Sequence, residues 1–349
     1  MKAFVTGSTG LLGGNLVRLL LEQGWEVKAL VRTPEKARRF LGSLNVEVVQ
    51  GDIENVAGFA PQLAGVDVLF HTAAYFREYY GSGDHWAKLV RLNVDATIEL
   101  LTAAEQYGVK KAIYTSSNGT IGRGKHQQIA DENTPPDQHT LSNLYFKSKV
   151  LSDQAVAEFV RTHRMPVVTI LPGWMHGPGD AAPTAGGQMV IEFLNGRLPG
   201  ILDGGLDIVD VRDVADAMLA MVERGRSGER YLVSGRYATI KEFLQSLERV
   251  SGVRAPRMVI PTPVINVIAA FSERAAQMTG RDTLMTRAGI QSLTAKKMNS
   301  SAKAITELGI GFRPLDETLR DSVAWYAAHM PEVLPKGFTV PRQPAHAMG

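Results

Sequence analysis

The stretch Met1–Asn15, MKAFVTGSTGLLGGN, decides the fold. Its run Ala3–Val5 is short, apolar and β-prone, which is typical of a buried parallel strand. Glycines follow at positions 7, 10 and 13, and leucines at helical spacing come after them. Gly7 can adopt a tight turn that a Cβ would block, Gly10 lets the backbone approach a pyrophosphate, and Gly13 lets the helix pack closely on the strand. A strand, a glycine turn and a helix in this order predict a phosphate-binding cradle, because the helix N-terminus offers N–H donors and a partial positive charge. The alternative is a glycine-rich loop that holds no ligand.

Composition narrows the class of protein. The chain has 349 residues, of which 44% are hydrophobic and 21% charged, so it can form one large globular domain or two unequal ones. The net charge of +3 comes from interspersed acids and bases, which argues against a nucleic-acid partner. There is no cysteine, which excludes disulfides, thiolate zinc sites and a cysteine nucleophile. No apolar run reaches the roughly 18 residues of a membrane span, and the opening strand leaves no room for a cleaved signal peptide. We therefore expect a cytoplasmic protein without a membrane span or a metal site.

Strands and helices alternate from the first residue to about residue 172. Further strands are expected at 26–31, 46–50, 66–70, 111–115 and 167–171. Long helices are expected from about Trp86 to Tyr107 and from Tyr145 to His163, and the polar, proline-containing stretch 127–142 is expected to be a loop. Alternation of this kind predicts a parallel sheet covered by helices on both faces, as in a Rossmann-type doubly wound α/β fold.

The alternation loosens after residue 172, which predicts a smaller C-terminal α/β domain for substrate binding. Helices are expected there near 187–196, 213–223, 240–250 and 262–279. The dinucleotide-binding domain is assigned to residues 1–172 with a return segment at about 206–234, the substrate-binding domain to 173–205 and 235–330, and a mobile tail to 331–349. The cleft between the two domains is the expected substrate site.

Arg32 stands at the end of the second strand, 19 residues after Gly13, where cofactor choice is decided. An acid here would bind the ribose 2′-hydroxyl of NAD, whereas an arginine accommodates the 2′-phosphate of NADP. The position therefore predicts NADP(H) rather than NAD(H). The alternative for Arg32 is a solvent-exposed basic residue at the start of a helix. We adopt that interpretation for Arg38 and Arg39.

The next strand ends supply further cofactor contacts. Asp52, in Gly51-Asp52-Ile53, is placed to meet the adenine edge, and the small residues of Thr72-Ala73-Ala74 would let the backbone lie against the cofactor. His71 is interpreted as a structural histidine at a strand end. The aromatic stretch from Tyr75 to Trp86 is either an apolar lid over a substrate or a flap packed on the body of the protein.

Tyr145 and Lys149 are the candidate catalytic pair. They lie four residues apart on a predicted helix and so share one face. A phenol with a pKa near 10 is a poor base at neutral pH, and a neighbouring ammonium brings that pKa toward the working range. Ser117 follows the fifth strand and could hold a substrate oxygen at the same point. Alone, a tyrosine and a lysine at this spacing would indicate an exposed pair on a helix; 28 residues after a strand-end serine, they indicate acid–base chemistry.

These pieces together resemble the extended short-chain dehydrogenases/reductases of the NAD-dependent epimerase/dehydratase superfamily. The matching motifs are Thr6-Gly7-Ser8-Thr9-Gly10-Leu11-Leu12-Gly13, His71-Thr72-Ala73-Ala74, Asn93, Thr115-Ser116-Ser117, Tyr145-x-x-x-Lys149, Pro172-Gly173, Asp210-Val211-Arg212-Asp213-Val214-Ala215, Gly228-Glu229-Arg230-Tyr231, Lys303-Ala304, Leu308-Gly309, Arg313-Pro314 and Trp325-Tyr326. The similarity covers about residues 1–328.

The resemblance implies roles for individual residues. Tyr145 would be the acid/base, Lys149 would lower its pKa and orient the nicotinamide ribose, Ser117 would polarise the carbonyl, and Asn93 would hold a water in a proton relay. The backbone after Pro172 would contact the nicotinamide. The cofactor-binding set is then Gly7, Thr9, Gly10, Leu11, Leu12, Gly13, Arg32, Asp52, Ile53, Thr72, Ala73, Ala74, Tyr145, Lys149, Pro172 and Gly173. Members of the family are commonly homodimers through the two long helices that begin here near Trp86 and Tyr145.

Two departures from the superfamily pattern indicate which branch of the superfamily the chain resembles. Sugar-nucleotide dehydratases carry an Asp-Glu pair where Ser116-Ser117 stand, and nucleotide-sugar epimerases carry a diphosphate-binding arginine where Leu206 stands. The chain is thus most similar to the dihydroflavonol-reductase-like and 3β-hydroxysteroid-dehydrogenase-like branch. The expected function is NADP(H)-dependent reduction of a ketone or aldehyde, or oxidation of the alcohol, on a largely apolar small molecule. A nucleotide-sugar epimerase and a non-catalytic NADP-sensing protein are the alternatives.

Overall fold

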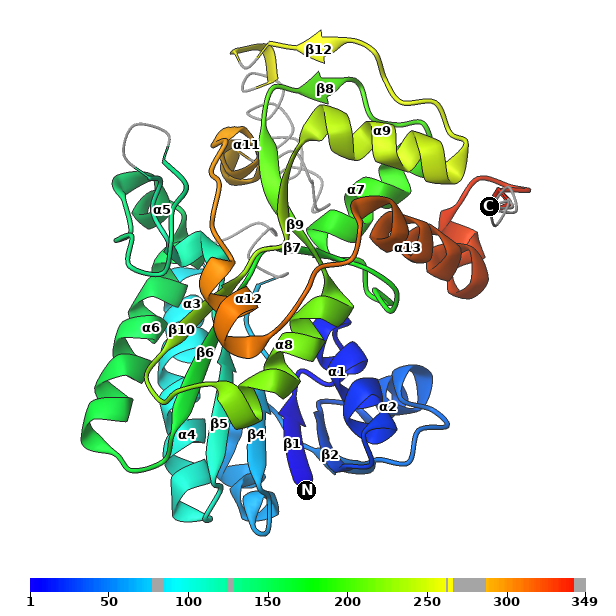
Figure 1. The fold of residues 1–349 in the computed structure, drawn as a ribbon. Coiled ribbons are helices and arrows are strands. Elements are labelled where there is room, and N and C mark those ends of the chain that lie inside the picture. Colours follow the sequence, from blue (N-terminus) through cyan, green and yellow to red (C-terminus); the bar gives the residue numbers. More distant parts are fainter. Residues whose placement is uncertain (77–84, 125–127, 262, 266–286, 342–349) are drawn as a thin grey trace.

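The computed structural model describes residues 1–76, 85–124, 128–261, 263–265 and 287–341. Its main feature is a seven-stranded parallel sheet with the order β10-β6-β5-β4-β1-β2-β3 (Figure 1). The strands are β1 (Lys2–Thr6), β2 (Glu26–Val31), β3 (Glu47–Gln50), β4 (Val68–His71), β5 (Lys111–Thr115), β6 (Val167–Pro172) and β10 (Arg230–Val233). The predicted doubly wound sheet is confirmed, with β10 joining it from the return segment.

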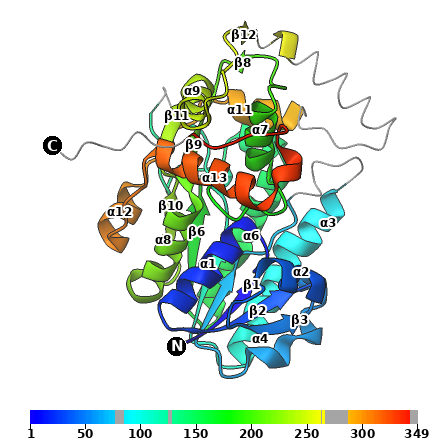
Figure 2. The same ribbon diagram turned by 90° about the vertical axis from the view of Figure 1, so that its right-hand side faces the viewer.

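Helices cover both faces of this sheet (Figure 2). Alternate residues of β1 point to opposite faces, so Ala3 and Val5 enter one core while Phe4 enters the other. The first core lies under α1 (Leu11–Glu22), α2 (Pro34–Phe40) and α8 (Val211–Arg224). The second core lies under α4 (Ala96–Gln106) and α6 (Leu144–Thr162). Short 3-10 turns connect the elements at η1 (Ile53–Gly58), η2 (Ala60–Leu63) and η5 (Asn118–Thr120).

The long helix predicted from residue 86 to residue 107 contains an irregularity. It consists of α3 (Trp86–Val90), a π-helical turn η4 (Arg91–Asp95) and α4. The stretch predicted as a loop, 127–142, includes the five-residue helix α5 (Gln138–Ser142), which begins where Asp137 accepts a hydrogen bond from the Thr140 backbone N–H. Residue periodicity reports neither a π-turn nor a single turn that depends on a side-chain cap.

The second part of the chain has its own core. A three-stranded sheet of β7 (Trp174–His176), β9 (Gly205–Asp210) and β11 (Arg236–Thr239) packs with α7 (Ala185–Leu194), α9 (Ile240–Ser251) and α13 (Leu315–His329). A two-stranded sheet of β8 (Ile201–Leu202) and β12 (Val259–Ile260) and the helix α11 (Arg287–Thr294) complete it. Except for residues 263–265, the helix expected at 262–279 lies outside the described residues, as does most of the aromatic stretch after Phe76.

Two segments depart from the expected domain layout. Helix α12 (Ala302–Leu308), assigned to the second domain, packs instead on the core of the first through Ala304 and Leu308. The tail expected to be mobile from residue 331 is packed as far as residue 341. It forms the 3-10 turn η7 (Pro331–Val333), Leu334 is buried in the second core, and Asn195 donates a hydrogen bond to the Val333 carbonyl at 2.9 Å.

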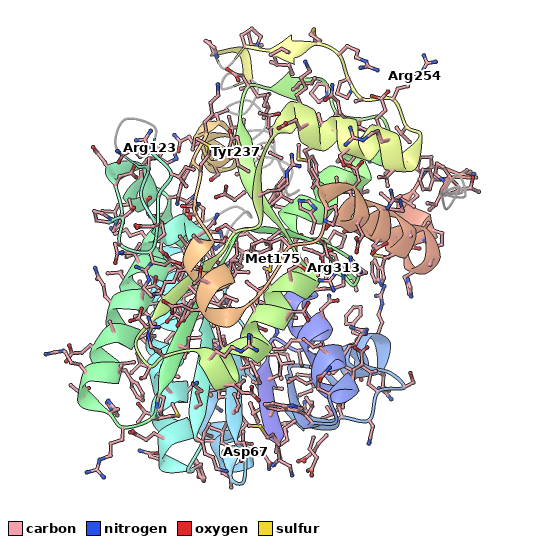
Figure 3. The ribbon with its side chains drawn as sticks, viewed as in Figure 1. Asp67, Arg123, Met175, Tyr237, Arg254 and Arg313 are labelled. Carbon is pink, nitrogen blue, oxygen red and sulfur yellow. The ribbon has the colours of Figure 1, made fainter. Side chains whose placement is uncertain are left out.

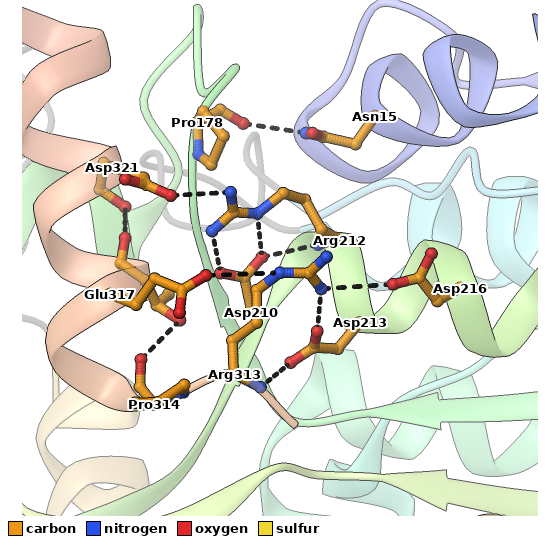
Figure 4. Close-up of polar contacts among 12 residues, drawn as sticks. Asn15, Pro178, Asp210, Arg212, Asp213, Asp216, Arg313, Pro314, Glu317 and Asp321 are labelled. Carbon is orange, nitrogen blue, oxygen red and sulfur yellow. Dashed lines mark hydrogen bonds and ion pairs between the residues drawn. The ribbon is translucent and has the colours of Figure 1, made fainter. Parts of the chain in front are cut away.

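Ion pairs join the two parts at the start of α8, where β9 ends (Figure 4). Asp210 is buried and accepts hydrogen bonds from the Nε and the terminal nitrogen of Arg212 at 2.9 and 2.7 Å, and Arg212 also pairs with Asp321 of α13 at 2.7 Å. Arg313 pairs with the buried Asp213 and lies near the centre of the molecule, where the two parts meet (Figure 3). Asp210 caps α8, and Asp213 in the first turn of the same helix accepts the Arg313 backbone N–H at 2.8 Å just before α13 begins, so charges at the start of α8 hold the two parts together.

Among the described residues, no helix is both long and apolar enough to cross a membrane.

Candidate active site

The predicted site residues lie along one edge of the large sheet. All seven strands are parallel, so the segments that follow β1, β2, β3, β4, β5 and β6 emerge at the same, carboxyl-terminal edge. In open α/β sheets this edge is where ligands bind. The fold therefore gathers segments that are far apart in the chain into one strip.

The glycine turn after β1 leaves no room for side chains. Gly7 has φ of +67°, a conformation that side chains rarely adopt. A Cβ on Gly13 would lie 2.2 Å from the carbonyl oxygen of Gly7, so α1 can approach the turn this closely only with a glycine there. Gly10 is the N-cap of α1, has no side-chain cap, and the first turn of α1 carries no acid. A bare helix N-terminus behind a side-chain-free turn fits a pyrophosphate group.

Hydrogen bonds hold this turn to its neighbours. The Ser8 hydroxyl donates to the Leu30 carbonyl near the end of β2 at 2.7 Å, and the Thr72 hydroxyl donates to the Thr6 carbonyl at 2.6 Å. His71 lies buried between the hydroxyls of Thr6 and Thr97, at 2.8 and 3.1 Å. Burial, with the charge of a nearby lysine, lowers the pKa of His71 to about 3. The prediction of a structural histidine is confirmed.

The two residues predicted to contact the adenosine half lie at the ends of neighbouring strands. Arg32 follows β2 directly, is exposed, and has no hydrogen-bond or ion-pair partner within the described ranges. Asp52 follows β3 and caps η1 by accepting the backbone N–H of Glu54 at 3.0 Å. One carboxylate oxygen of Asp52 is thus occupied by the cap, whereas the Arg32 guanidinium is available to an anion.

Tyr145 and Lys149 lie at the start of α6 and both are buried, with 8% and 1% of their surface exposed. The Lys149 ammonium donates to the Thr115 carbonyl at 2.7 Å and lies 4.6 Å from the ring centroid of Tyr114. Burial lowers the pKa of Lys149 to about 8, against the opposing charge of Asp153. These values exclude the alternative of an exposed pair on a helix surface.

Ser117 begins the turn that follows β5. Its hydroxyl accepts the backbone N–H of Gly119 at 3.0 Å and caps η5. A Cβ on Gly119 would lie 2.2 Å from the ring of Phe146, the residue after Tyr145. The Ser117 turn and the first turn of α6 therefore pack directly on each other, so the segments that carry the candidate serine and tyrosine are in contact.

Asn93 lies within the π-turn and connects three segments. Its side-chain carbonyl accepts the Tyr75 backbone N–H at 2.8 Å, and its amide donates to the Tyr75 carbonyl and to the Ser148 hydroxyl, each at 3.1 Å. Its backbone carbonyl accepts the Ser152 hydroxyl at 2.7 Å. Asn93 thus holds the start of the aromatic stretch against α6, while the relay water suggested by the resemblance stays a prediction.

Pro172 and Gly173 end β6 at the same edge. The Gly173 backbone N–H donates to the Val233 carbonyl at 3.1 Å, and a Cβ at this position would lie 2.8 and 2.9 Å from the carbonyl oxygens of Ser234 and Asp207. Only a glycine lets the chain pass between β9 and β10 here. The segment after Pro172 therefore has a fixed backbone path beside the Ser117 turn.

Two charges near the Ser117 turn, the buried Asp207 and the partly buried Lys297, were not singled out by the sequence analysis. Asp207 follows Leu206, a position that the sequence analysis discussed only because epimerases carry an arginine there. Lys297 lies in no recognised motif. Burial raises the pKa of Asp207 to about 6 and lowers that of Lys297 to about 8. Its place next to Leu206, the position considered for a diphosphate-binding arginine, was the only available signal for Asp207. In the described part of the chain, no group of three or more metal-ligating side chains could hold a metal ion.

Comparison with known proteins agrees with this geometry. The sequence profile of the NAD dependent epimerase/dehydratase family matches residues 3–234. A Synechocystis sp. protein, named provisionally as a dihydroflavonol 4-reductase, is 31% identical over 330 residues, covering 93% of this chain and 94% of that protein. Sterol demethylase protein B of Methylococcus capsulatus is 32% identical over 329 residues, covering 93% and 98%. The crystal structure of gox2253 superposes with a TM-score of 0.80 at 33% identity, covering 94% and 98%.

Proposed function

Because the chain belongs to the NAD dependent epimerase/dehydratase family and is an extended short-chain dehydrogenase/reductase, we propose that it is an NADP(H)-dependent oxidoreductase. The proposed reaction is reduction of a ketone or aldehyde, or oxidation of the corresponding alcohol, on a largely apolar small molecule. The observation that carries the proposal is the buried Tyr145–Lys149 pair beside the Ser117 turn.

Tyr145 is the proposed proton donor to the carbonyl oxygen. Lys149 has a pKa of about 8 and is therefore largely cationic at neutral pH, where its charge stabilises a neighbouring phenolate. The low-dielectric surroundings strengthen that effect relative to water. With its lone pair engaged by the Gly119 N–H, the Ser117 hydroxyl keeps its own proton for the substrate oxygen. Together these groups act on the oxygen atom, and the bound nicotinamide supplies the hydride.

The residues present fit a phosphorylated dinucleotide. The side-chain-free turn at Gly7 and Gly13 would hold the pyrophosphate against the α1 N-terminus, and Arg32 would pair with the 2′-phosphate. Lys149 would contact the nicotinamide ribose. We propose NADP(H) over NAD(H) because an exposed guanidinium stands at the end of β2 where an acid would be needed for the ribose hydroxyl.

The cofactor proposal is tested by calorimetric binding of NADPH and NADH. Arg32→Ala is expected to weaken NADPH binding by about tenfold to a hundredfold, because a charge-assisted phosphate contact is lost, and to leave NADH binding unchanged. Arg38→Ala is the matched control, since Arg38 is exposed in the following helix and pairs with Glu35 at 3.0 Å. Equal affinities of NADPH for the wild type and Arg32→Ala would contradict the assignment.

The substrate class is proposed from three observations. The relatives named above carry dihydroflavonol and sterol in their names, which points to apolar ring systems. Leu206 is half-buried and packs toward the second core, where an epimerase would need an arginine for a diphosphate. Ser116-Ser117 replace the acidic pair of the dehydratases. Each of these favours carbonyl reduction over sugar-nucleotide chemistry.

The reaction is tested by following NADPH absorbance with dihydroflavonols, 3-ketosteroids and aromatic aldehydes. Tyr145→Phe is expected to turn over the substrate about 10²–10⁴ times more slowly than the wild type, because that factor is the usual contribution of a general acid. Tyr107→Phe is the control, because Tyr107 is exposed at the end of α4, away from the carboxyl edge of the sheet. Full turnover in Tyr145→Phe would refute the mechanism, and no oxidation of NADPH by any carbonyl would refute the activity.

A further inference from the structure

A group of polar side chains from the second part of the chain lies against the Ser117 turn; we call it the Lys297 cluster, made of Asn118, Asp207, Lys297 and Asn299. The Lys297 ammonium donates to the Asn118 carbonyl at 2.6 Å and also to the Ile121 carbonyl. These two carbonyls lie at the start of η5 and directly after its end. One ammonium therefore spans the turn that Ser117 caps.

Asp207 fixes the segment that carries this lysine. Its carboxylate is buried in β9, and one oxygen accepts the backbone N–H of Asn299 at 3.1 Å and the Asn299 side-chain amide. The same oxygen lies 3.5 Å from the Asn118 amide nitrogen. Residues 298–300 also pair with Ala130 through two backbone hydrogen bonds, of 2.9 and 2.8 Å. The segment is thus held on both sides, and Lys297 has little freedom to leave the turn.

The turn needs such a contact because its own hydrogen bonds are few. Within η5, the Gly119 N–H is bonded to the Ser117 hydroxyl and the Thr120 N–H to the Ser117 carbonyl. The Asn118 carbonyl also accepts the Ile121 backbone N–H at 3.2 Å, and the Ile121 carbonyl accepts the Thr140 hydroxyl at 3.3 Å, so each oxygen has one further acceptor position. A partly buried cation on both carbonyls takes their second acceptor positions and fixes the path of the backbone from which the serine side chain projects.

We propose that Lys297, held in place by Asp207, is a positioning residue for Ser117: the second part of the chain supplies the contact that fixes the hydroxyl which polarises the substrate carbonyl. This inference rests on the proposed function. Loss of Lys297 would let the turn move, the Ser117 hydroxyl would lose its alignment with the substrate oxygen, and the chemical step would slow. Displacement of a catalytic group by about 1 Å can lower a rate about a hundredfold.

The experiment compares Lys297→Met with two matched variants. Lys297→Arg keeps a cation with several donors, and Lys296→Met removes the neighbouring lysine, which is half exposed and pairs instead with Asp203 at 2.8 Å. With NADPH and the dihydroflavonols or 3-ketosteroids of the panel, Lys297→Met is expected to lower kcat by about tenfold to a hundredfold with little change in KM or in NADPH affinity. Lys297→Arg should restore kcat to within about threefold, and Lys296→Met should match the wild type.

A double substitution separates positioning from a general loss of structure. In a Ser117→Ala background, Lys297→Met should cost almost nothing further, because the residue through which it acts is gone. Equal losses in both backgrounds, or an unchanged kcat in Lys297→Met, would overturn the proposal. If Ser117→Ala itself keeps full turnover, it is the proposed function of the serine that fails.

Amide hydrogen exchange gives a readout that needs no substrate. Exchange in a peptide covering residues 117–121 should be faster in Lys297→Met than in the wild type, and unchanged in Lys296→Met and Lys297→Arg. Unchanged exchange in Lys297→Met would overturn the contact on which the proposal depends. Should Lys297→Met not fold, Lys297→Gln, which keeps two donors without the charge, takes its place in each measurement and is expected to show the same loss of kcat and faster exchange.

Discussion

The buried ammonium of Lys149 predicts that an active-site residue lowers the stability of the protein at neutral pH. Its surface is 1% exposed, and burial lowers its pKa from 10.5 to about 8. A shift of this size corresponds to roughly 3 kcal/mol between the charged and neutral forms. Because the folded pKa lies below the unfolded one, the unfolded state binds more protons between these two values. The penalty is therefore complete below about pH 8 and disappears as the pH rises through 10.5.

The substitution Lys149→Met removes the charge while keeping the length of the side chain. Proton linkage between the two pKa values gives a penalty of about 3 kcal/mol at about pH 7 and about 1 kcal/mol at about pH 9.5. The wild type should therefore gain about 2 kcal/mol of unfolding free energy relative to Lys149→Met over this interval. Methionine also loses the hydrogen bond to Thr115 and the contact with the Tyr114 ring, but that loss is nearly constant with pH and cancels in the comparison.

The assay is guanidinium unfolding of the cofactor-free proteins at the two pH values, followed by tryptophan fluorescence. In a second pair of proteins, one with Lys149 and one with Lys149→Met, both members carry Tyr145→Phe. In this pair the Tyr145 phenol is absent, so its titration cannot cause a pH-dependent difference in stability. A stability difference between wild type and Lys149→Met that is the same at both pH values would refute the reasoning. At neutral pH, turnover by Lys149→Met is expected to fall by about 10²–10⁴, so function and stability would not change together.

Three further predictions concern the scaffold of the site. Gly13→Ala places a Cβ 2.2 Å from a backbone oxygen and should cost about 1–3 kcal/mol and abolish cofactor binding by calorimetry. Gly14→Ala should be tolerated, because its Cβ would lie 3.3 Å from the flexible end of Arg18 and at an ordinary contact distance of 3.6 Å from the Ser8 carbonyl oxygen. Arg212→Met leaves the buried Asp210 carboxylate without its guanidinium and should lower the unfolding free energy by about 3 kcal/mol at about pH 7. Although burial alone would raise the pKa of Asp210, the Arg212 hydrogen bonds hold it below its usual value, so this loss should shrink as the pH falls through that lowered pKa; an acid-independent loss would contradict the assignment. His71, with a pKa of about 3, should show no titration of its ring protons by NMR between about pH 5 and pH 8.

The sequence predicts the large sheet well because its signals are local. The alternation of Ala3, Phe4 and Val5 between two cores follows from the strand period, and the glycine turn and Arg32 occupy positions fixed by the geometry of the first βαβ unit. The burial of both Tyr145 and Lys149 at the start of one helix is consistent with the helix period, which places them on one face. Each of these predictions needed no knowledge of what packs against the element.

Several features that the sequence did not predict depend on contacts between distant segments. The π-turn at Asn93 is a backbone irregularity whose partners, Tyr75 and Ser148, are 18 and 55 residues away. Lys297 reaches carbonyls 176 and 179 residues earlier in the chain. The tail after residue 331 is proline-rich and was expected to be mobile, yet its described residues as far as Val340 make apolar contacts with the second core. The periodicity of apolar residues predicts which face of a helix or strand is buried, but not which segment packs against that face.

Strand β9 explains why the second part of the chain can act on the catalytic turn. Its six residues carry Asp207, which holds the Lys297 segment against the Ser117 turn, and three residues later Asp210, whose partner Arg212 binds α13 through Asp321. Since β9 also pairs with β7, which continues from Gly173, it cannot shift without moving the chain that we propose contacts the nicotinamide. Changes that accommodate different substrates are therefore expected in α7, α9 and the segments around them, while β9 keeps the serine in one position. A variant with altered substrate preference should carry its substitutions in those segments and retain Asp207 and Asp210.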